Sequence, residues 1–169
     1  MRVPALIALT GMALAAAGCT STRPAGVATT PIVVASAPQP VAGYDWFFHE
    51  DGQEALLAYG LEASDDLRLG LGCAKAGGQL TLNATAPKGV ADEIHIEAGG
   101  ETERFAARSE PSELNDGVFL TASADVEEPV FQRFRQVGWL AVWQGDTREA
   151  YAPHPASREN IEKFFIFCG

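Results

Sequence analysis

Short apolar runs separated by glycine-containing turns fill the chain beyond residue 43. The turn Asp51-Gly52 lies between two apolar or aromatic runs, and in the runs around Ala76-Gly77-Gly78 and Gly99-Gly100 apolar and polar residues alternate. Alternation with a period of two is typical of strands with one buried face, and such turns are typical of hairpins. The pattern predicts strands at residues 44–49, 54–59, 67–74, 79–85, 93–97, 104–107, 118–126, 139–143 and 147–152.

Two further segments place apolar residues three and four positions apart, which predicts helices. The first is Pro129–Val137, with Val130, Phe131, Phe134 and Val137 on one face. The second is residues 156–167, with Ser157 as the candidate N-cap. We therefore expect one globular domain, residues 44–169, with a mainly β fold: an antiparallel β-sandwich or barrel-like domain with a short internal helix and a C-terminal helix.

The first 18 residues have the layout of an export signal. A positive start at Arg2 precedes an apolar run from Val3 to Ala17, which is shorter than the about 20 residues of a permanent transmembrane helix and matches a secretory signal. The segment Leu14-Ala15-Ala16-Ala17-Gly18-Cys19 resembles the lipobox of bacterial lipoprotein precursors, with Ala16 where leucine is usual. Residues 1–18 are thus expected to be a lipoprotein signal peptide.

This resemblance implies that the thiol of Cys19 receives a diacylglycerol, that cleavage occurs just before Cys19 and that the new amino group is acylated. Several acyl chains give stable membrane anchoring, whereas one chain is marginal. Thr20 stands where family members kept at the inner membrane carry aspartate, so the resemblance implies anchoring at the periplasmic face of the outer membrane. Ordinary signal cleavage after Ala17 is the alternative.

Residues 19–43 are expected to tether the domain to this anchor. The segment carries one charge, Arg23, and prolines at positions 24, 31, 38 and 40 among Ala, Thr, Ser and Val. Such a composition is typical of a semi-extended linker, which at ~3.1 Å per residue reaches on the order of 70 Å. An ordinary N-terminal tail without an anchoring role is the alternative.

Two cysteines remain for the domain, Cys73 and Cys168. Exported proteins meet oxidising conditions, which favours a disulfide. Cys73 shares a predicted strand face with Leu67, Leu69 and Leu71, and Cys168 shares a predicted helix face with Ile161, Phe164 and Phe165. Packing of these two faces would bring the sulfurs within bonding range and close a loop of about 95 residues, for about 4–5 kcal/mol. Two buried free thiols are the alternative.

The charge balance and the motifs limit the chemistry of the chain. Its 12 Lys and Arg against 22 Asp and Glu give a net charge of −10, which repels phosphate backbones, so we expect no nucleic-acid partner. The sequence holds no nucleophile-elbow serine, no H-E-x-x-H and no phosphate-binding glycine loop. Neither domain cysteine has a histidine at ligand spacing. We therefore expect no catalytic residues, no metal site and no cofactor.

Two features of the predicted strands could mark a binding surface. Residues 139–143 are apolar at every position, which fits either a strand covered on both sides or an apolar groove or partner patch lined by Trp139 and Trp143. Gly70 and Gly72 alternate with the predicted inward leucines. They mark either a close approach of another backbone or the geometry of a sheet edge.

The order of the aromatic strand, the turns and the final Phe164–Cys168 segment is similar to small exported proteobacterial domains, a resemblance that transfers no functional residues. We expect a non-catalytic envelope lipoprotein whose domain binds another envelope protein or supports an envelope assembly. The alternatives are a module that binds an apolar ligand or lipid, and an inhibitor of lysozyme-type enzymes, whose Ser-Gly…Tyr signature is not seen. An enzyme is the last choice.

Overall fold

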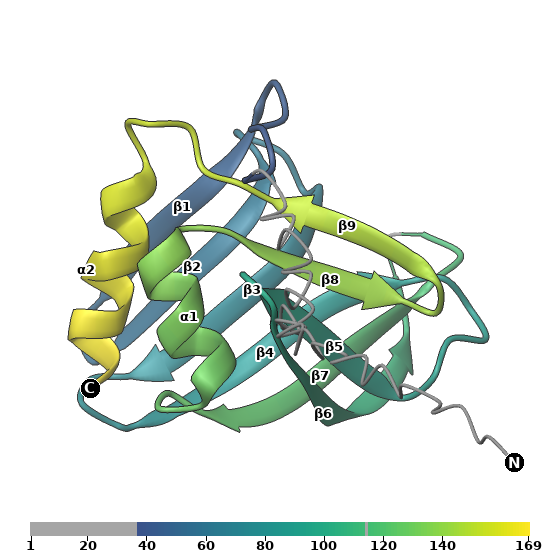
Figure 1. Ribbon diagram of the computed structural model, residues 1–169. Helices are drawn as coiled ribbons and strands as arrows, with labels where there is room; N and C mark the ends of the chain where they lie inside the picture. Colours follow the sequence, from purple (N-terminus) through teal and green to yellow (C-terminus); the bar gives the residue numbers. More distant parts are fainter. Residues whose placement is uncertain (1–36, 114) are drawn as a thin grey trace, which may run out of the picture. The chain divides into compact units, whose positions relative to one another are not determined.

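The computed structural model of the chain describes residues 37–113 and 115–169 (Figure 1). The predicted signal peptide, the lipidation residue Cys19 and the predicted tether up to residue 36 lie outside the described residues. No helix in the described ranges is long and apolar enough to cross a bilayer. The elements are β1 (Tyr44–Asp51), β2 (Glu54–Leu61), β3 (Leu67–Ala74), β4 (Gln79–Ala86), β5 (Glu93–Ala98), β6 (Glu101–Pro111), β7 (Val118–Asp125), α1 (Pro129–Val137), β8 (Leu140–Gln144), β9 (Thr147–Tyr151) and α2 (Arg158–Cys168).

The nine strands form one antiparallel sheet in the order β1-β2-β3-β4-β7-β6-β5-β8-β9. The expected hairpins β1–β2, β3–β4 and β5–β6 are present, and the pairs β4–β7 and β5–β8 join segments that are far apart in the chain. The sheet curls into a nearly closed barrel. The prediction of a mainly β fold with a short internal helix and a C-terminal helix is confirmed, in its barrel-like form.

Side chains join the two edge strands, β1 and β9, across the gap in the barrel. The indole Nε1 of Trp46 on β1 donates to the backbone carbonyl of Tyr151 on β9 at 3.2 Å. The carboxylate of Asp45 accepts hydrogen bonds from the backbone N–H of His154, at 3.0 Å, and from the hydroxyl of Ser157. These bonds occupy part of an edge that could otherwise pair with another chain.

Both helices pack on the inner face of the curled sheet, α1 against β5 and β6 and α2 against β1 and β2 (Figure 1). Their apolar faces are the ones expected from the sequence. Phe134 of α1 lies 5.1 Å from Trp46 and 6.0 Å from Phe165 of α2, between ring centroids, and all three rings are buried. A fully buried side chain of this size contributes about 1.5–3 kcal/mol, so this aromatic core is a main source of stability.

A disulfide attaches the end of α2 to the sheet. Cys73 of β3 and Cys168 of α2 are bonded, with their Cα atoms 5.7 Å apart. In the β3–β4 turn, the N–H groups of Ala76 and Gly78 donate to the carbonyls of Phe167 and Cys168, at 2.9 and 3.0 Å. Carbonyls in the last turn of a helix lack intrahelical partners, so the turn satisfies them.

Strand β3 departs from the predicted alternation at its start. Tyr59 of β2 pairs with Leu69 and Gly60 pairs with Leu67, so Arg68 is an extra residue, a β-bulge. Leu69 faces the core as expected, but Leu67 is 44% exposed and lies on the outer face of the sheet. The expectation that Leu67 shares the inner face is wrong, because one inserted residue reverses the side on which the preceding residue points.

The start of α2 also differs from the expectation. The helix begins at Arg158, and Ser157 occupies the N-cap position as expected, but its side chain makes no capping bond. Its hydroxyl instead donates to Asp45, so the residue joins the helix to β1. The hydroxyl of Ser157, which the sequence suggested as a helix cap, is therefore used in the contact with β1.

Candidate functional site

Side chains from both helices fill the inside of the barrel. A hollow that reaches the core beside Ile94 and Leu120 has a volume of about 20 Å³, the space of a single water. Larger hollows, of about 160 to 630 Å³, open on the surface. In the described ranges, no group of three or more His, Cys, Asp or Glu could hold a metal ion. Candidate sites therefore lie on the outer face and at the rim of the barrel.

Both predicted patch residues, Trp139 just before strand β8 and Trp143 within it, lie on the outer face of the barrel. Leu140 and Val142 point into the main core, while Trp139 packs with Ala141 in a small outer cluster. Trp139 is only 9% exposed. Trp143 is half-buried and lines an open hollow of about 470 Å³, of which Trp139 is not part. The two rings therefore do not line one groove.

An ion pair holds these tryptophans in place. Glu97 of β5 accepts hydrogen bonds from Nε1 of Trp143 at 2.9 Å and from Nε and Nη2 of Arg148 at 2.8 Å each. The Arg148 guanidinium lies over the Trp139 ring, 5.5 Å from its centroid. The hydrogen bonds from Arg148, and then from Trp143, lower the pKa of Glu97. The polar groups of this cluster thus bond to one another.

His95 borders the same hollow on the outer face. Its ring stacks on Trp143 with centroids 5.9 Å apart, and its Nε2 lies 2.6 Å from the hydroxyl of Thr102. Burial, followed by the charge of Arg104, lowers the pKa of His95 below its usual value. At neutral pH the imidazole is therefore uncharged and serves as a packing and hydrogen-bonding group.

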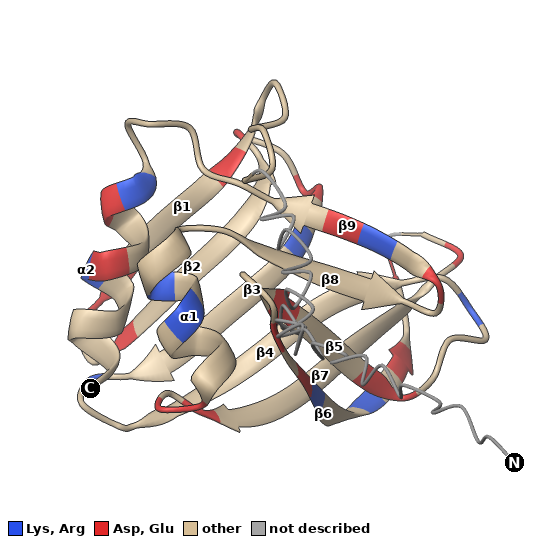
Figure 2. Ribbon diagram, in the orientation of Figure 1, with Lys and Arg blue, Asp and Glu red and all other residues tan. Residues whose placement is uncertain are grey.

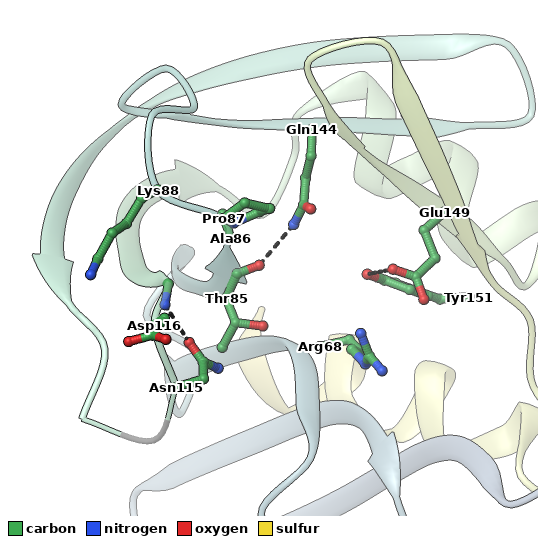
Figure 3. Close-up of a pocket in the computed structure, with 11 residues that line it drawn as sticks. Arg68, Thr85, Ala86, Pro87, Lys88, Asn115, Asp116, Gln144, Glu149 and Tyr151 are labelled. Carbon is green, nitrogen blue, oxygen red and sulfur yellow. Dashed lines mark hydrogen bonds between the residues drawn. The ribbon is translucent and has the colours of Figure 1, made fainter.

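One rim of the barrel forms a polar hollow of about 420 Å³, which we call the barrel mouth. Strands β3, β4, β8 and β9 and the loops around Lys88 and Asp116 contribute to it. Its lining includes Arg68, Thr85, Gln144, Glu149 and Tyr151. In Figure 3 these five side chains surround the hollow, whereas the amine of Lys88 points away from it. Arg68 and Glu149, which carry opposite charges, thus face one cavity.

Arg68 reaches the mouth because of the bulge in β3. Its Nη2 donates to the hydroxyl of Tyr44 at 3.2 Å, and its guanidinium lies 5.4 Å from the centre of that ring. Its Nε lies 3.0 Å from Asp66 Oδ1, in an ion pair. The opposite wall is Tyr151, whose ring stacks on that of Tyr59 at 4.5 Å. A guanidinium held in one position is suited to binding an anionic group.

A second candidate surface lies on the outer face of β2, β3, β4 and β7, which carries few charged residues (Figure 2). Gly70 of β3 pairs with Ala58 of β2 and with Asn83 of β4, so small residues sit side by side. Three large, exposed apolar side chains, Leu56, Leu67 and Phe119, border these small residues. We call the surface formed by Leu56, Ala58, Leu67, Gly70, Gly72 and Phe119 the outer furrow. Its apolar end has a volume of about 160 Å³.

Neither backbone conformation nor packing requires glycine in the outer furrow. Neither Gly70 nor Gly72 has a positive φ. A Cβ at Gly70 would lie 3.5 Å from Leu56 Cδ1, and one at Gly72 would meet nothing closer than 3.9 Å. Glycine inside a strand costs about 0.5–1 kcal/mol relative to alanine. A Cβ could therefore be added at either glycine without a steric clash.

The other end of the outer furrow is polar and acidic. A hollow of about 630 Å³ runs over Leu56 and Gly72 to His49, Asp51 and Glu54. Neither of these carboxylates has an ion-pair or hydrogen-bond partner in the described part of the chain. The furrow thus changes from apolar to negatively charged along its length.

The chain matches no family model, no curated protein and no solved structure in the comparisons made. The candidate sites therefore rest on the geometry of the described residues alone. The aromatic residues that the sequence suggested are largely used for packing, and the outer furrow was indicated only by the two glycines in β3. Leu56 and Phe119 could have been found as apolar residues on the outward positions of their strands, but Leu67 required the bulge to be known.

Proposed function

We propose that this protein is a non-catalytic envelope lipoprotein, anchored through acyl chains on Cys19 at the periplasmic face of the outer membrane. Its domain binds another envelope protein along the outer furrow. The observation that carries the proposal is the group of exposed apolar side chains around two glycines at which a Cβ would meet no steric clash. Leu56, Leu67 and Phe119 are 38%, 44% and 41% exposed there, and burying such side chains gains about 25 cal/mol per Å².

The shape of the outer furrow favours an extended segment of the partner. Gly70 and Gly72 are two residues apart on one strand, which corresponds to about 7 Å. An extended chain lying along β3 has the same spacing between alternate side chains, so two of them would fill the two gaps. We expect at least one of these side chains to be large and apolar, because Phe119 and Leu67 border the apolar end.

The charge of the outer furrow predicts a basic residue in the same segment. Asp51 and Glu54 lie at the polar end, and the whole chain carries a net charge of −10. Complementary charges steer association and fix the register of the bound segment. The partner segment is therefore an extended one that carries an apolar side chain and, nearby, a lysine or arginine.

The apolar-ligand alternative receives little support. Lipid-binding barrels hold their ligand inside, but aromatic side chains of α1 and α2 occupy the inside of this barrel. Nor does any surface in the described ranges favour the lysozyme-inhibitor alternative. Protein binding along the outer furrow is the hypothesis that accounts for the exposed apolar side chains around Gly70 and Gly72.

Site-specific crosslinking in living cells tests the docking surface. A photoreactive phenylalanine analogue replaces Phe119 in the full-length lipoprotein, and the same analogue at Glu103 of β6 is the control site. We expect one crosslinked envelope protein at position 119 and none at 103. Mass spectrometry of the adduct should place the crosslink next to an apolar and a basic residue of the partner.

Filling the outer furrow provides the matched control. The double variant Gly70→Thr, Gly72→Thr should abolish the adduct while the fold is retained, because both positions accept a Cβ. Ala106→Thr, an exposed strand position on β6, should leave the adduct unchanged. An adduct that survives in the filled furrow, or no adduct at position 119, would overturn the proposed docking surface.

Anchoring through Cys19 is tested separately by the intact mass of the mature protein extracted in detergent. The expected species begins at Cys19 and carries a diacylglycerol and an amide-linked acyl chain. A mature chain without fatty acid contradicts the lipoprotein assignment, while the crosslinking result would still report on the outer furrow.

A further inference from the structure

Some of the hydrogen-bond donors of Arg68 have no partner in the described residues and can reach the barrel mouth. Tyr44 and Asp66 hold its Nη2 and Nε on one side. Nη1 donates to no described residue, and Nε is buried with only the ion-pair contact to Asp66. The guanidinium is therefore fixed in place with donors left over. Such a group binds a carboxylate or phosphate without further ordering of its own side chain.

Glu149 brings the opposite charge to the same hollow. It lies on β9 next to Tyr151, whose hydroxyl donates to Glu149 Oε2 at 3.3 Å. Glu149 and Arg68 line one cavity but are not bonded to each other in the described structure. Each is anchored by its own neighbours, and Glu149 adds to the raised pKa of Arg68 after the larger effects of the hydrogen bond with Tyr44 and the charge of Asp66.

A buried polar atom without a partner lies behind the lining residue Tyr151 and does not itself line the mouth. The hydroxyl of Tyr59, stacked behind Tyr151, is buried without a hydrogen-bond partner in the described residues. Burial raises the pKa of Tyr59 to about 12, so this hydroxyl stays protonated and can only act as a neutral donor or acceptor. The amide of Gln144 and the hydroxyl of Thr85 face the hollow from the other side (Figure 3).

We propose that the barrel mouth binds a small zwitterion, an amino acid or a short peptide, whose carboxylate contacts Arg68 and whose ammonium contacts Glu149. A single anion would meet the repulsion of Glu149, and a single cation that of Arg68. A molecule that carries both charges satisfies both groups at once. The volume of about 420 Å³ accommodates an amino acid or a dipeptide. This inference is independent of the outer furrow, which lies on the outer face of the sheet.

Calorimetric titration of the full mature protein in detergent tests the two-charge requirement. Four probes are compared: alanine, alanyl-alanine, N-acetylalanine, which keeps only the carboxylate, and alaninamide, which keeps only the ammonium. We expect one of the two zwitterions to bind at least about tenfold more tightly than either single-charge probe. Alanine and alanyl-alanine differ in the distance between their charges. The one that binds more tightly therefore shows whether the site fits a free amino acid or a peptide.

Charge-removing variants assign the two contacts. Glu149→Gln should bring the affinity for the zwitterion down to that for N-acetylalanine, and Arg68→Gln should bring it down to that for alaninamide. Arg104→Gln, at an exposed position of strand β6, should change neither. Because Arg68→Gln also removes the contact with Tyr44, its fold is checked by circular dichroism, and Glu149→Gln alone suffices if that variant unfolds.

Two outcomes would overturn the inference: equal affinity for all four probes, and no heat of binding for either zwitterion up to about 10 mM. The variant with threonine at positions 70 and 72 should bind the zwitterion as the parent protein does. Failure at the barrel mouth and failure at the outer furrow are thereby distinguished.

Discussion

Strand β3 presents opposite chemistry to the two sides of the sheet. On the inner side, Leu69 and Leu71 are almost completely buried and Cys73 is bonded to the end of α2. On the outer side, Gly70 and Gly72 carry no side chain; Gly70 is buried beside Leu56 and Gly72 is half-buried. One strand of eight residues thus contributes large side chains to the core and two positions without side chains to the outer face.

This difference separates stability from binding along a single strand. The inner side chains are attached to both the aromatic core and the disulfide, so changes there alter the free energy of unfolding. At the outer positions Gly70 and Gly72 an added Cβ meets no clash, so changes there should mainly alter what the protein binds. The outer face of β5, β8 and β9 is a third case, because Glu97 and Arg148 cover its tryptophans with an ion pair.

The largest expected effect is on the inner side, at the disulfide. The double variant Cys73→Ser, Cys168→Ser opens a loop with a sequence separation of 95 residues and should lower the free energy of unfolding by about 4–5 kcal/mol, through the entropy of the unfolded chain. Chemical denaturation of the variant and the parent measures the difference. A loss below about 1 kcal/mol would mean that the link between β3 and α2 contributes little.

A pair of leucine truncations compares the two sides directly. Leu71→Ala, inside, should cost about 3 kcal/mol because it removes a fully buried side chain and leaves a cavity. Leu56→Ala, in the outer furrow, should change the free energy of unfolding by less than about 0.5 kcal/mol. Equal losses at the two positions would show that the outer side is packed as tightly as the inner one.

Removing the charge of Glu97, on the outer face of β5, should lower the free energy of unfolding by an intermediate amount that depends on pH. Glu97→Gln weakens the bonds to Arg148 and Trp143 and should cost about 2 kcal/mol at neutral pH. Because the pKa of Glu97 is lowered in the folded state, this stabilisation is complete above the usual glutamate pKa of about 4.3 and is lost as pH falls through the lowered value.

Unfolding of Glu97→Gln and of the parent is compared between pH 7 and pH 3, with Glu103→Gln on the exposed strand β6 as the control. The two stability curves should converge on acidification for Glu97→Gln, while Glu103→Gln should follow the parent throughout. A difference at Glu97 that is independent of pH would contradict the assigned role of its charge.

The smallest effect on stability is expected in the outer furrow, and it has the opposite sign. Gly70→Thr should raise the free energy of unfolding by about 0.5–1 kcal/mol, because glycine is unfavourable inside a strand and threonine is favourable. Denaturation compared with Ala106→Thr measures the gain. A clear destabilisation would show that the backbone at residue 70 needs glycine after all, and would remove the argument that the furrow is kept open for a ligand.

The local pattern of the chain determined most of the elements. Alternating apolar residues and glycine turns indicated the strands and hairpins, and the spacing of phenylalanines indicated both helices with the faces they bury. These predictions worked because the period of a strand or helix is a short-range property. The disulfide followed from the same reasoning, since both sulfurs share a face with buried apolar neighbours. The lipid anchor at Cys19 stays a prediction from a sequence resemblance.

Only the tertiary structure decided where the candidate sites lie. The pairing of β4 with β7 placed Phe119 beside Thr85, near Leu67, and the bulge at Arg68 sent Leu67 outward and the guanidinium toward Glu149. The same strand order put Trp143 next to Glu97, so that the most suggestive residues of the sequence became part of a bonded cluster. Strand order and bulges depend on contacts between residues far apart in the chain, and local periodicity carries no record of them.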